Sequence, residues 1–239
     1  MSVDVDDREA LQRDAAGIGA LADPVRRQLY QFVCAQPAPV SRDQAADAVG
    51  IPHHQAKFHL DRLTAEGLLE FDYARLTGRS GPGAGRTSKL YRRARRDIAV
   101  SLPQREYELA GRLMATAIAR SADSGEPVAE ILNRVAREYG HEIGATSVGS
   151  APPEDAAAAL ARAVGVLRRY GYEPRFCDSE VELANCPFHA LAQEQTELAC
   201  NMNQALITGV ADALAPHGPD ARLCPGRNRC CVVLTAGAQ

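Results

Sequence analysis

The sequence lacks the features of a secreted, membrane-spanning or catalytic protein. Its N-terminus, MSVDVDDREA, has neither a basic start nor an apolar run, and no window approaches the ~18 consecutive apolar residues of a membrane span. It also contains no phosphate-binding loop, nucleophile elbow or catalytic carboxylate pair. We therefore expect a cytoplasmic protein that is neither an enzyme nor a membrane protein.

Paired CxxC motifs are absent too, although cysteine is not scarce. Five of the seven cysteines lie in residues 186–231, at positions 186, 200, 224, 230 and 231. In a reducing compartment, clustered cysteines indicate metal or redox chemistry more often than structural disulfides. A thiol enzyme would depend on the adjacent Cys230 and Cys231 alone, and we disfavour it.

Acidic residues are missing from residues 75–96. This stretch carries eight Lys and Arg and no Asp or Glu, whereas the whole chain has a net charge of -3. A run of one sign is the electrostatic footprint of a surface that meets a polyanion.

The residues upstream of the basic run predict one opening helix and then two short helices joined by a turn. In GALADPVRRQLYQFVCAQ, apolar spacing indicates a first helix, with Asp23 before Pro24 as its N-cap. Ser41 and Gln44 fit a capping box for a short helix that ends at Gly50. The next helix, in IPHHQAKFHLDRLTAEGLL, is apolar on one face and polar on the other, as a recognition helix is.

A winged hairpin follows. LEFDYARL and TSKLYRRA read as strands on either side of the loop RSGPGAGR. The segments LADPVRRQLY, HLDRLTAEGLL and KLYR resemble the winged helix-turn-helix domain of ArsR-like bacterial transcriptional regulators, over about residues 15–96.

The predicted recognition helix suggests which residues contact DNA. A helix of about 12 residues fits the major groove, where His54, Gln55, Lys57 and His59 could reach base edges. Further basic residues suit phosphates and the wing: Arg62, Arg75, Arg79, Arg86 and Lys89. The histidines could be mistaken for a metal site, but no cysteine or carboxylate pattern accompanies them, so we favour DNA contact. For Phe58, packing and contact with a thymine methyl both stay open.

The helix expected in LPQREYELAGRLMATAIARSA has a broad apolar stripe. This stripe favours a dimer interface, since dimers match palindromic operators, and packing on the chain's own C-terminal part is the alternative. We accordingly predict a winged helix-turn-helix DNA-binding domain (1–98), a linker and dimerisation helix (99–122) and a C-terminal sensor domain (123–239). The expected fold class is mainly α with small β-sheets (α+β).

The cysteine-rich end combines several elements. We expect a hairpin in EPRFCDSEVELANC that delivers Cys186, a helix that carries Cys200, and a final strand, RCCVVL, that carries Cys230. Three ligands could thus converge from three elements. The spacing is compatible with zinc or with a cluster held by separate segments.

This end of the chain resembles the C-terminal domain of SufR-type regulators, winged-helix proteins that bind an iron-sulfur cluster and regulate cluster-assembly genes. The resemblance is carried by NCPFHALA, ELACNMNQAL and the terminal RCC. It implies Cys186, Cys200 and Cys230 as ligands and leans to [4Fe-4S], while three cysteines with one histidine could also hold [2Fe-2S]. A fourth cysteine of the family would fall near Leu214, where this chain has none.

The fourth ligand therefore stays open. We favour His189, in the NCPFH run, slightly over Cys224. Cys231 would point away from Cys230 on a strand and is expected as strand filler. Cys177 is expected as a strand residue, with a resolving thiol as the alternative.

Taken together, these patterns predict a homodimeric DNA-binding transcriptional regulator, with a repressor favoured, that binds double-stranded operator DNA. An iron-sulfur cluster would control its operator affinity, in response to iron supply, oxidants or nitric oxide. The alternatives are a zinc-binding winged-helix regulator that uses the same Cys/His site, and a regulator whose C-terminal domain binds an organic ligand.

Overall fold

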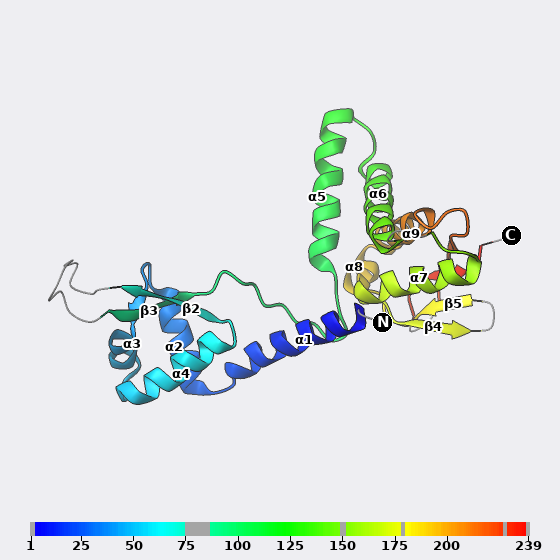
Figure 1. The fold of residues 1–239 in the computed structure, drawn as a ribbon. Coiled ribbons are helices and arrows are strands. Elements are labelled where there is room, and N and C mark those ends of the chain that lie inside the picture. Colours follow the sequence, from blue (N-terminus) through cyan, green and yellow to red (C-terminus); the bar gives the residue numbers. More distant parts are fainter. Residues whose placement is uncertain (1–2, 75–86, 149–151, 178–179, 227–228, 238–239) are drawn as a thin grey trace. The chain divides into compact units, whose positions relative to one another are not determined.

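The computed structural model describes residues 3–74, 87–148, 152–177, 180–226 and 229–237. The chain divides into two compact units, residues 1–100 and 101–239, each with its own apolar core. Helices predominate, and the strands form two small antiparallel sheets (Figure 1). The predicted fold class, mainly α with small β-sheets, is confirmed.

The first unit has the elements of a winged helix-turn-helix. They are α1 (Val3–Ala20), α2 (Pro24–Ala35), β1 (Val40–Ser41), α3 (Arg42–Val49), α4 (His53–Ala65), β2 (Leu69–Ala74) and β3 (Ser88–Arg93). The sheet has the order β1-β3-β2, with β2 and β3 forming the wing hairpin. Both predicted wing strands are confirmed, and the wing loop, residues 75–86, lies outside the described residues.

Local signals start and stop these helices as predicted. The Asp23 side chain accepts a hydrogen bond of 3.0 Å from the Arg26 backbone N–H, which caps α2. Ser41 and Gln44 form both bonds of a capping box on α3. Gly50 ends α3 with a φ of 72°, a conformation that glycine adopts without strain.

Helix α1 was not predicted from the sequence. The helix packs against the rest of its unit: Ala20 is buried, and Arg96 forms an ion pair with Asp14. A Cβ at Gly17 would lie 2.8 Å from Cδ1 of Ile98, so the two segments approach closely. The residues that contact α1 lie about eighty positions later in the sequence, so the sequence of α1 itself does not indicate that these contacts stabilise a helix.

The second unit packs helices on a four-stranded sheet. Its elements are α5 (Tyr107–Ser124), α6 (Val128–Val148), α7 (Ala156–Arg169), β4 (Pro174–Cys177), β5 (Glu180–Leu183), α8 (His189–Glu194), α9 (Thr196–Asp212), β6 (Asp220–Leu223) and β7 (Val232–Thr235). The sheet order is β4-β5-β7-β6, all antiparallel. The predicted hairpin and final strand are present, and β6 was not predicted.

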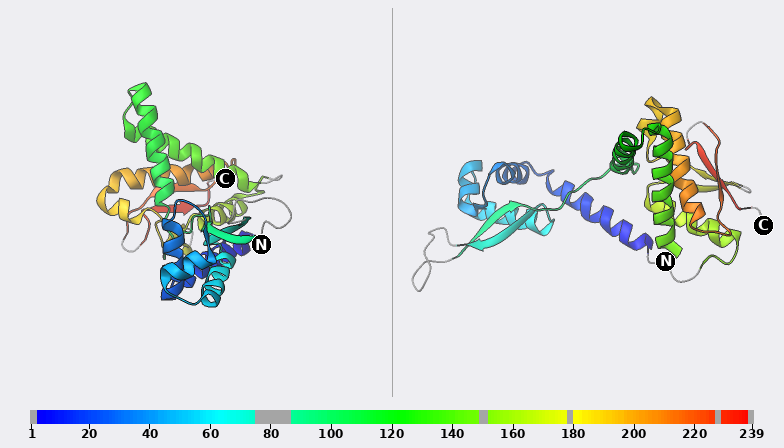
Figure 2. Two further views of the ribbon diagram at one scale, coloured as in Figure 1. Left: turned by 90° about the vertical axis from the view of Figure 1, so that its left-hand side faces the viewer. Right: turned by 90° about the horizontal axis from the view of Figure 1, so that it is seen from above.

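Helices α6 and α9 lie side by side in both views of Figure 2, with their backbones nearly touching. A Cβ at Gly140 would lie 1.9 Å from the Leu206 carbonyl oxygen, and one at Gly209 would lie 2.0 Å from that of Arg137. Only glycine permits such an approach. The contact fixes α9, which carries Cys200.

Helix α5 belongs to the second unit, whose first residue is 101. Leu109, Leu113 and Ala117 are buried and join the core of that unit. This part of the apolar stripe is therefore used inside the chain, which was the alternative to the favoured dimer interface. Ile118, on the same helix, is 58% exposed.

Candidate functional site

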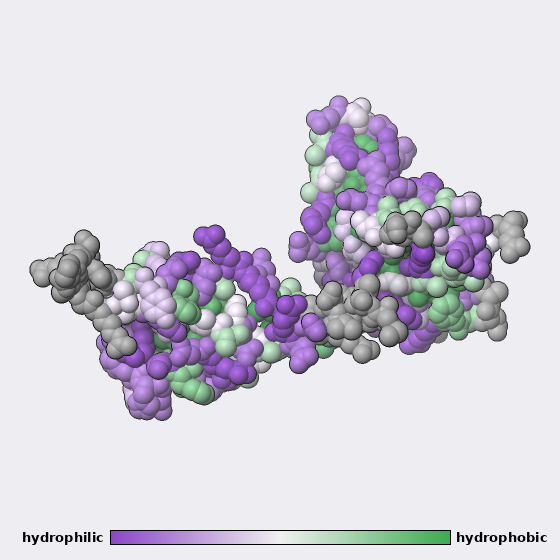
Figure 3. Space-filling view, viewed as in Figure 1, coloured by the Kyte–Doolittle hydropathy of each residue, from purple (hydrophilic) through white to green (hydrophobic). Residues whose placement is uncertain are grey.

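The recognition helix α4 presents a polar face to solvent. Ala56, Leu60 and Leu63 are fully buried, so they fix the orientation of the helix. His54, Gln55 and Lys57 are exposed on it, as expected for side chains that reach base edges. In Figure 3 the surface of this unit is mainly hydrophilic, with isolated apolar groups.

Two histidines of α4 have contacts inside the protein. His53 Nδ1 lies 2.8 Å from an Asp43 carboxylate oxygen and so ties the start of α4 to α3. His59 is half-buried, its ring packs edge-on against Phe58 at 5.3 Å between centroids, and its Nδ1 is buried without a partner among the described residues. His59 is therefore less exposed to solvent than His54, Gln55 and Lys57.

The expected phosphate-contacting residues fall into three groups. Arg62 is exposed and paired with Glu66 at 2.6 Å, one helical turn on. Lys89 lies 3.2 Å from an Asp61 carboxylate oxygen and 4.1 Å from the centre of the Phe71 ring, so it holds the wing against α4. The remaining three, Arg75, Arg79 and Arg86, lie outside the described residues.

Two aromatic residues of the first unit are largely exposed. Phe58 on α4 and Tyr73 on β2 are each 65% exposed, and each has one edge-on ring contact, with His59 and Phe71 respectively. Phe58 lies one turn after His54, so the helical period alone put it near the predicted contact residues. The sequence did not decide between packing and contact, and this exposure favours contact.

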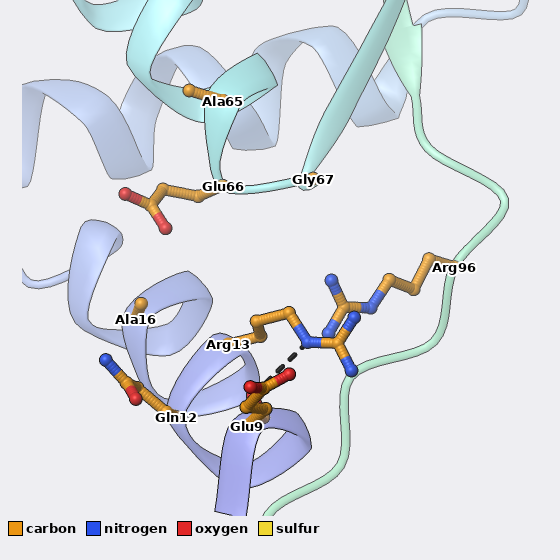
Figure 4. A pocket seen from close by; sticks show the side chains of 8 residues that line it. All are labelled: Glu9, Gln12, Arg13, Ala16, Ala65, Glu66, Gly67 and Arg96. Carbon is orange, nitrogen blue, oxygen red and sulfur yellow. Dashed lines mark hydrogen bonds between the residues drawn. The ribbon is translucent and has the colours of Figure 1, made fainter. Parts of the chain in front are cut away.

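A hollow of about 410 Å³ lies between α1 and the turn after α4 (Figure 4). Its charged lining residues are Glu9, Arg13, Glu66 and Arg96, and Arg13 donates a hydrogen bond of 3.2 Å to the Glu9 carbonyl. The lining combines charges of both signs with small apolar side chains and includes no large apolar or aromatic one, which suits a solvated crevice better than a ligand pocket.

In the second unit, four thiols gather between β5, α9 and β7. We name Cys186, Cys200, Cys230 and Cys231 the thiol cluster. Cys186 and Cys230 are buried and hydrogen-bonded to each other, and this bond, together with burial, raises the pKa of Cys186. Hydrogen bonds from Cys186 and Cys231 lower the pKa of Cys230, which is the acceptor of the group. Of the three cysteines that the sequence singled out, Cys186 and Cys230 are thus in direct contact, and Cys200 is joined to them through one addition.

The addition is Cys231, which we had expected as filler pointing away from Cys230. That expectation is wrong, because strand β7 begins only at Val232 and the two cysteines lie in a bend, where side chains need not alternate. Cys231 shares hydrogen bonds with Cys230 and with Cys200, and these bonds and burial raise its pKa. Cys231 therefore links the helix thiol to the strand-end thiols.

A buried polar relay holds the Cys230 sulfur. Asn203, one turn after Cys200 on α9, is 1% exposed and donates a hydrogen bond of 3.1 Å from Nδ2 to Cys230 Sγ. The Tyr172 hydroxyl donates to Asn203 Oδ1 in turn, and burial raises the pKa of that hydroxyl. The amide is thereby fixed with its N–H toward the sulfur.

The two favoured candidates for a fourth ligand contact the thiol cluster through their backbones, and within the described residues neither side chain bonds to it. His189 is exposed at the start of α8, and its ring makes no hydrogen bond or ion pair within the described part of the chain. Cys224 accepts a hydrogen bond of 3.3 Å from Arg229 Nη2, which raises the pKa of Arg229. Cys177 is exposed at the end of β4, where a strand residue was expected.

A polar clamp, made by Arg105 and Asn185, joins the thiol cluster to the chain that enters the second unit. Arg105 Nη1 donates to Asn185 Oδ1 at 2.6 Å and to the Cys186 carbonyl at 2.7 Å. Asn185 Nδ2 donates to the carbonyls of Gly171 and Gln104. The backbone just before Cys186 is thus held to residues 104–105, only a few positions beyond the unit boundary.

The thiol cluster suits a thiophilic group in its chemistry. Thiolates from separate segments are the ligands that zinc and iron-sulfur clusters take, and an amide N–H aimed at a ligand sulfur is a typical supporting contact. Among the residues that the structure describes, no three His, Cys, Asp or Glu side chains are already arranged to hold a metal ion. The residues fit as donors, and binding would require their side chains to rearrange.

Comparison with known proteins supports the first unit. Residues 21–70 match the model of a helix-turn-helix domain family, a span that includes α2, α3 and α4. No curated protein matches the chain. Within the described residues, no helix is long and apolar enough to cross a membrane. The match supports a DNA-binding transcriptional regulator.

Proposed function

We propose that this protein is a homodimeric transcriptional regulator, acting as a repressor, whose affinity for operator DNA is set by an iron-sulfur cluster on Cys186, Cys200 and Cys230. The observation that carries the proposal is the gathering of these thiols from three segments in a unit separate from the DNA-binding one. A [4Fe-4S] cluster is favoured. Such a group would supply a centre sensitive to iron and oxidants.

The residues around the thiols are suited to holding it. Asn203 directs an amide N–H at the Cys230 sulfur, and hydrogen bonds to a ligand sulfur tune the potential of a cluster. Cys186 and Cys230 are buried in the same core as Phe188 and Met202, whereas Cys200 and Cys231 are partly exposed. The site would thus be closed to solvent on the side of the core and partly open at Cys200 and Cys231.

The clamp gives the site a route to the DNA-binding unit. Because Arg105 bonds the carbonyl of Cys186 itself, a rearrangement of that ligand changes the anchoring of residues 104–105. These residues directly follow the end of the first unit at residue 100. Loss of the group would therefore alter how the two DNA-binding units of a dimer are held, and only one arrangement would span successive major grooves.

On DNA, α4 would supply base contacts through His54, Gln55 and Lys57, with Phe58 beside them. Dimerisation would use surface outside the buried row of α5, where Ile118 and Tyr107 are exposed and apolar side chains are visible among hydrophilic ones (Figure 3). A palindromic operator would match such a dimer. Sedimentation of the purified chain tests the dimer directly.

The alternative is a zinc-binding regulator that uses the same thiols, since zinc also takes cysteine ligands. Anaerobic purification followed by an absorbance spectrum and counts of iron, sulfide and zinc separates the two. Iron and sulfide in equal amounts with visible absorbance support the proposal. A colourless protein that contains zinc, or no metal after reconstitution with iron and sulfide, would refute it.

A further inference from the structure

Three ligands are named above, and a cluster of this kind commonly takes four. We propose that Cys231 is the fourth thiolate ligand, in place of His189 or Cys224. This inference rests on the proposed function, since it concerns the same site.

The position of Cys231 carries the argument. Its thiol is in hydrogen-bond contact with Cys230 on one side and with Cys200 on the other, so it lies between two of the three proposed ligands. It is half-buried and packs on the core of the second unit.

The bend before β7 makes two adjacent ligands compatible. The Cys230 N–H donates to the Leu183 carbonyl at 2.7 Å, and the Cys231 carbonyl accepts from the Cys224 N–H at 2.6 Å. The backbone is therefore anchored to β5 on one side and to the segment after β6 on the other, and the pair lies outside the alternation of β7. Both thiols can then face α9, as their contacts with Asn203 and Cys200 indicate.

Each competitor has an arrangement that argues against it. The His189 ring is exposed, and its backbone N–H, rather than its side chain, contacts Cys186, through the carbonyl at 3.1 Å. The Cys224 sulfur is engaged by Arg229, whose guanidinium also lies 3.3 Å from Glu182. Moving Cys224 into the site would break that contact with Arg229.

The test uses the full chain and iron with sulfide as the probe. Cys231→Ser, Cys224→Ser and His189→Ala are reconstituted anaerobically beside the wild type, with Cys177→Ser as a matched control at an exposed thiol. Iron, sulfide and visible absorbance are measured, followed by the rate at which a chelator removes iron. The apo forms are compared by circular dichroism and thermal melting, so that a folding defect is recognised.

We expect Cys231→Ser to lose iron at least about tenfold faster than the wild type, as for a lost ligand, with an unchanged apo fold. Cys224→Ser, His189→Ala and Cys177→Ser should match the wild type. Wild-type retention by Cys231→Ser, or equal loss in Cys224→Ser or His189→Ala, would overturn the inference while leaving the cluster in place. A wild type that takes up no iron and sulfide refutes the proposed function instead.

Discussion

Asn203 and Tyr172 allow a quantitative test of how the Cys230 sulfur is held. Both side chains are buried, and each satisfies the other: the Tyr172 hydroxyl donates to Asn203 Oδ1, while Asn203 Nδ2 donates to Cys230 Sγ at 3.1 Å. Removing one partner leaves the other buried and unpaired, at a cost of about 1–3 kcal/mol. Asn203→Leu and Tyr172→Phe should each lower the free energy of opening by about that amount.

The double variant distinguishes this account from simple loss of packing. Because it removes both polar partners, it should be less destabilised than the sum of the single variants, with a coupling of about 0.5–3 kcal/mol. Hydrogen exchange of α9 amides in the reduced apoprotein measures the opening of this unit alone. Asn201→Leu, on the same helix without a side-chain hydrogen bond in the described residues, is the control and should change little. Additive effects, within about 0.3–0.5 kcal/mol, would refute the relay.

Further outcomes follow from the structure. Lys57→Ala should weaken operator binding and make the slope of log affinity against log salt concentration shallower by up to about 1, as measured by electrophoretic mobility shift. Phe58→Ala should weaken binding in the same assay without a change in melting temperature, because its side chain is exposed. Gly209→Ala should destabilise the second unit by about 3 kcal/mol or more, because its Cβ would lie 2.0 Å from the Arg137 carbonyl oxygen. The control Gly165→Ala on α7 places its Cβ where nothing lies within 4 Å and should not destabilise the unit, as urea unfolding of the two variants will show. Arg105→Ala should retain iron but reduce the ratio of holo to apo operator affinity by about fivefold or more. Arg112→Ala, at an exposed position, is the control, and an unchanged ratio in Arg105→Ala would show that the clamp does not couple the site to DNA binding. The hydrogen bond from the Arg26 N–H lowers the pKa of Asp23, so the ionised cap should stabilise α2 at pH values above the ordinary pKa of 3.8. This stabilisation should be lost as the pH falls through the lowered pKa, and Asp23→Asn should reduce the fall in melting temperature at acid pH.

Local chemistry explains what could be predicted. Caps such as Asp23 and the pair Ser41 and Gln44 act within four residues, so the sequence itself contains the whole signal. The recognition helix was equally clear, because burial of Leu60 and Leu63 repeats with the helical period. The helix-turn-helix and its wing hairpin were therefore predicted.

Tertiary contacts explain what was not. Helix α1 is held by residues far along the chain, and the two-residue β1 is too short for any periodicity. The orientation predicted for Cys231 was wrong because side chains alternate only within a strand, and Cys231 directly precedes the start of β7. The resemblance would place a cysteine near position 214. Leu214 stands there and is fully buried, so an apolar side chain that packs in the core takes the place of a thiol.

Operator binding by the loaded and empty forms of one preparation tests the central claim most directly. An operator is first selected from random duplex DNA with the full chain, and affinity is then measured anaerobically at fixed salt before and after a chelator removes the cluster. The account predicts a change of about fivefold or more, reversed when iron and sulfide restore the cluster. Equal affinity of the two forms, with the cluster verified in one and absent from the other, would contradict it.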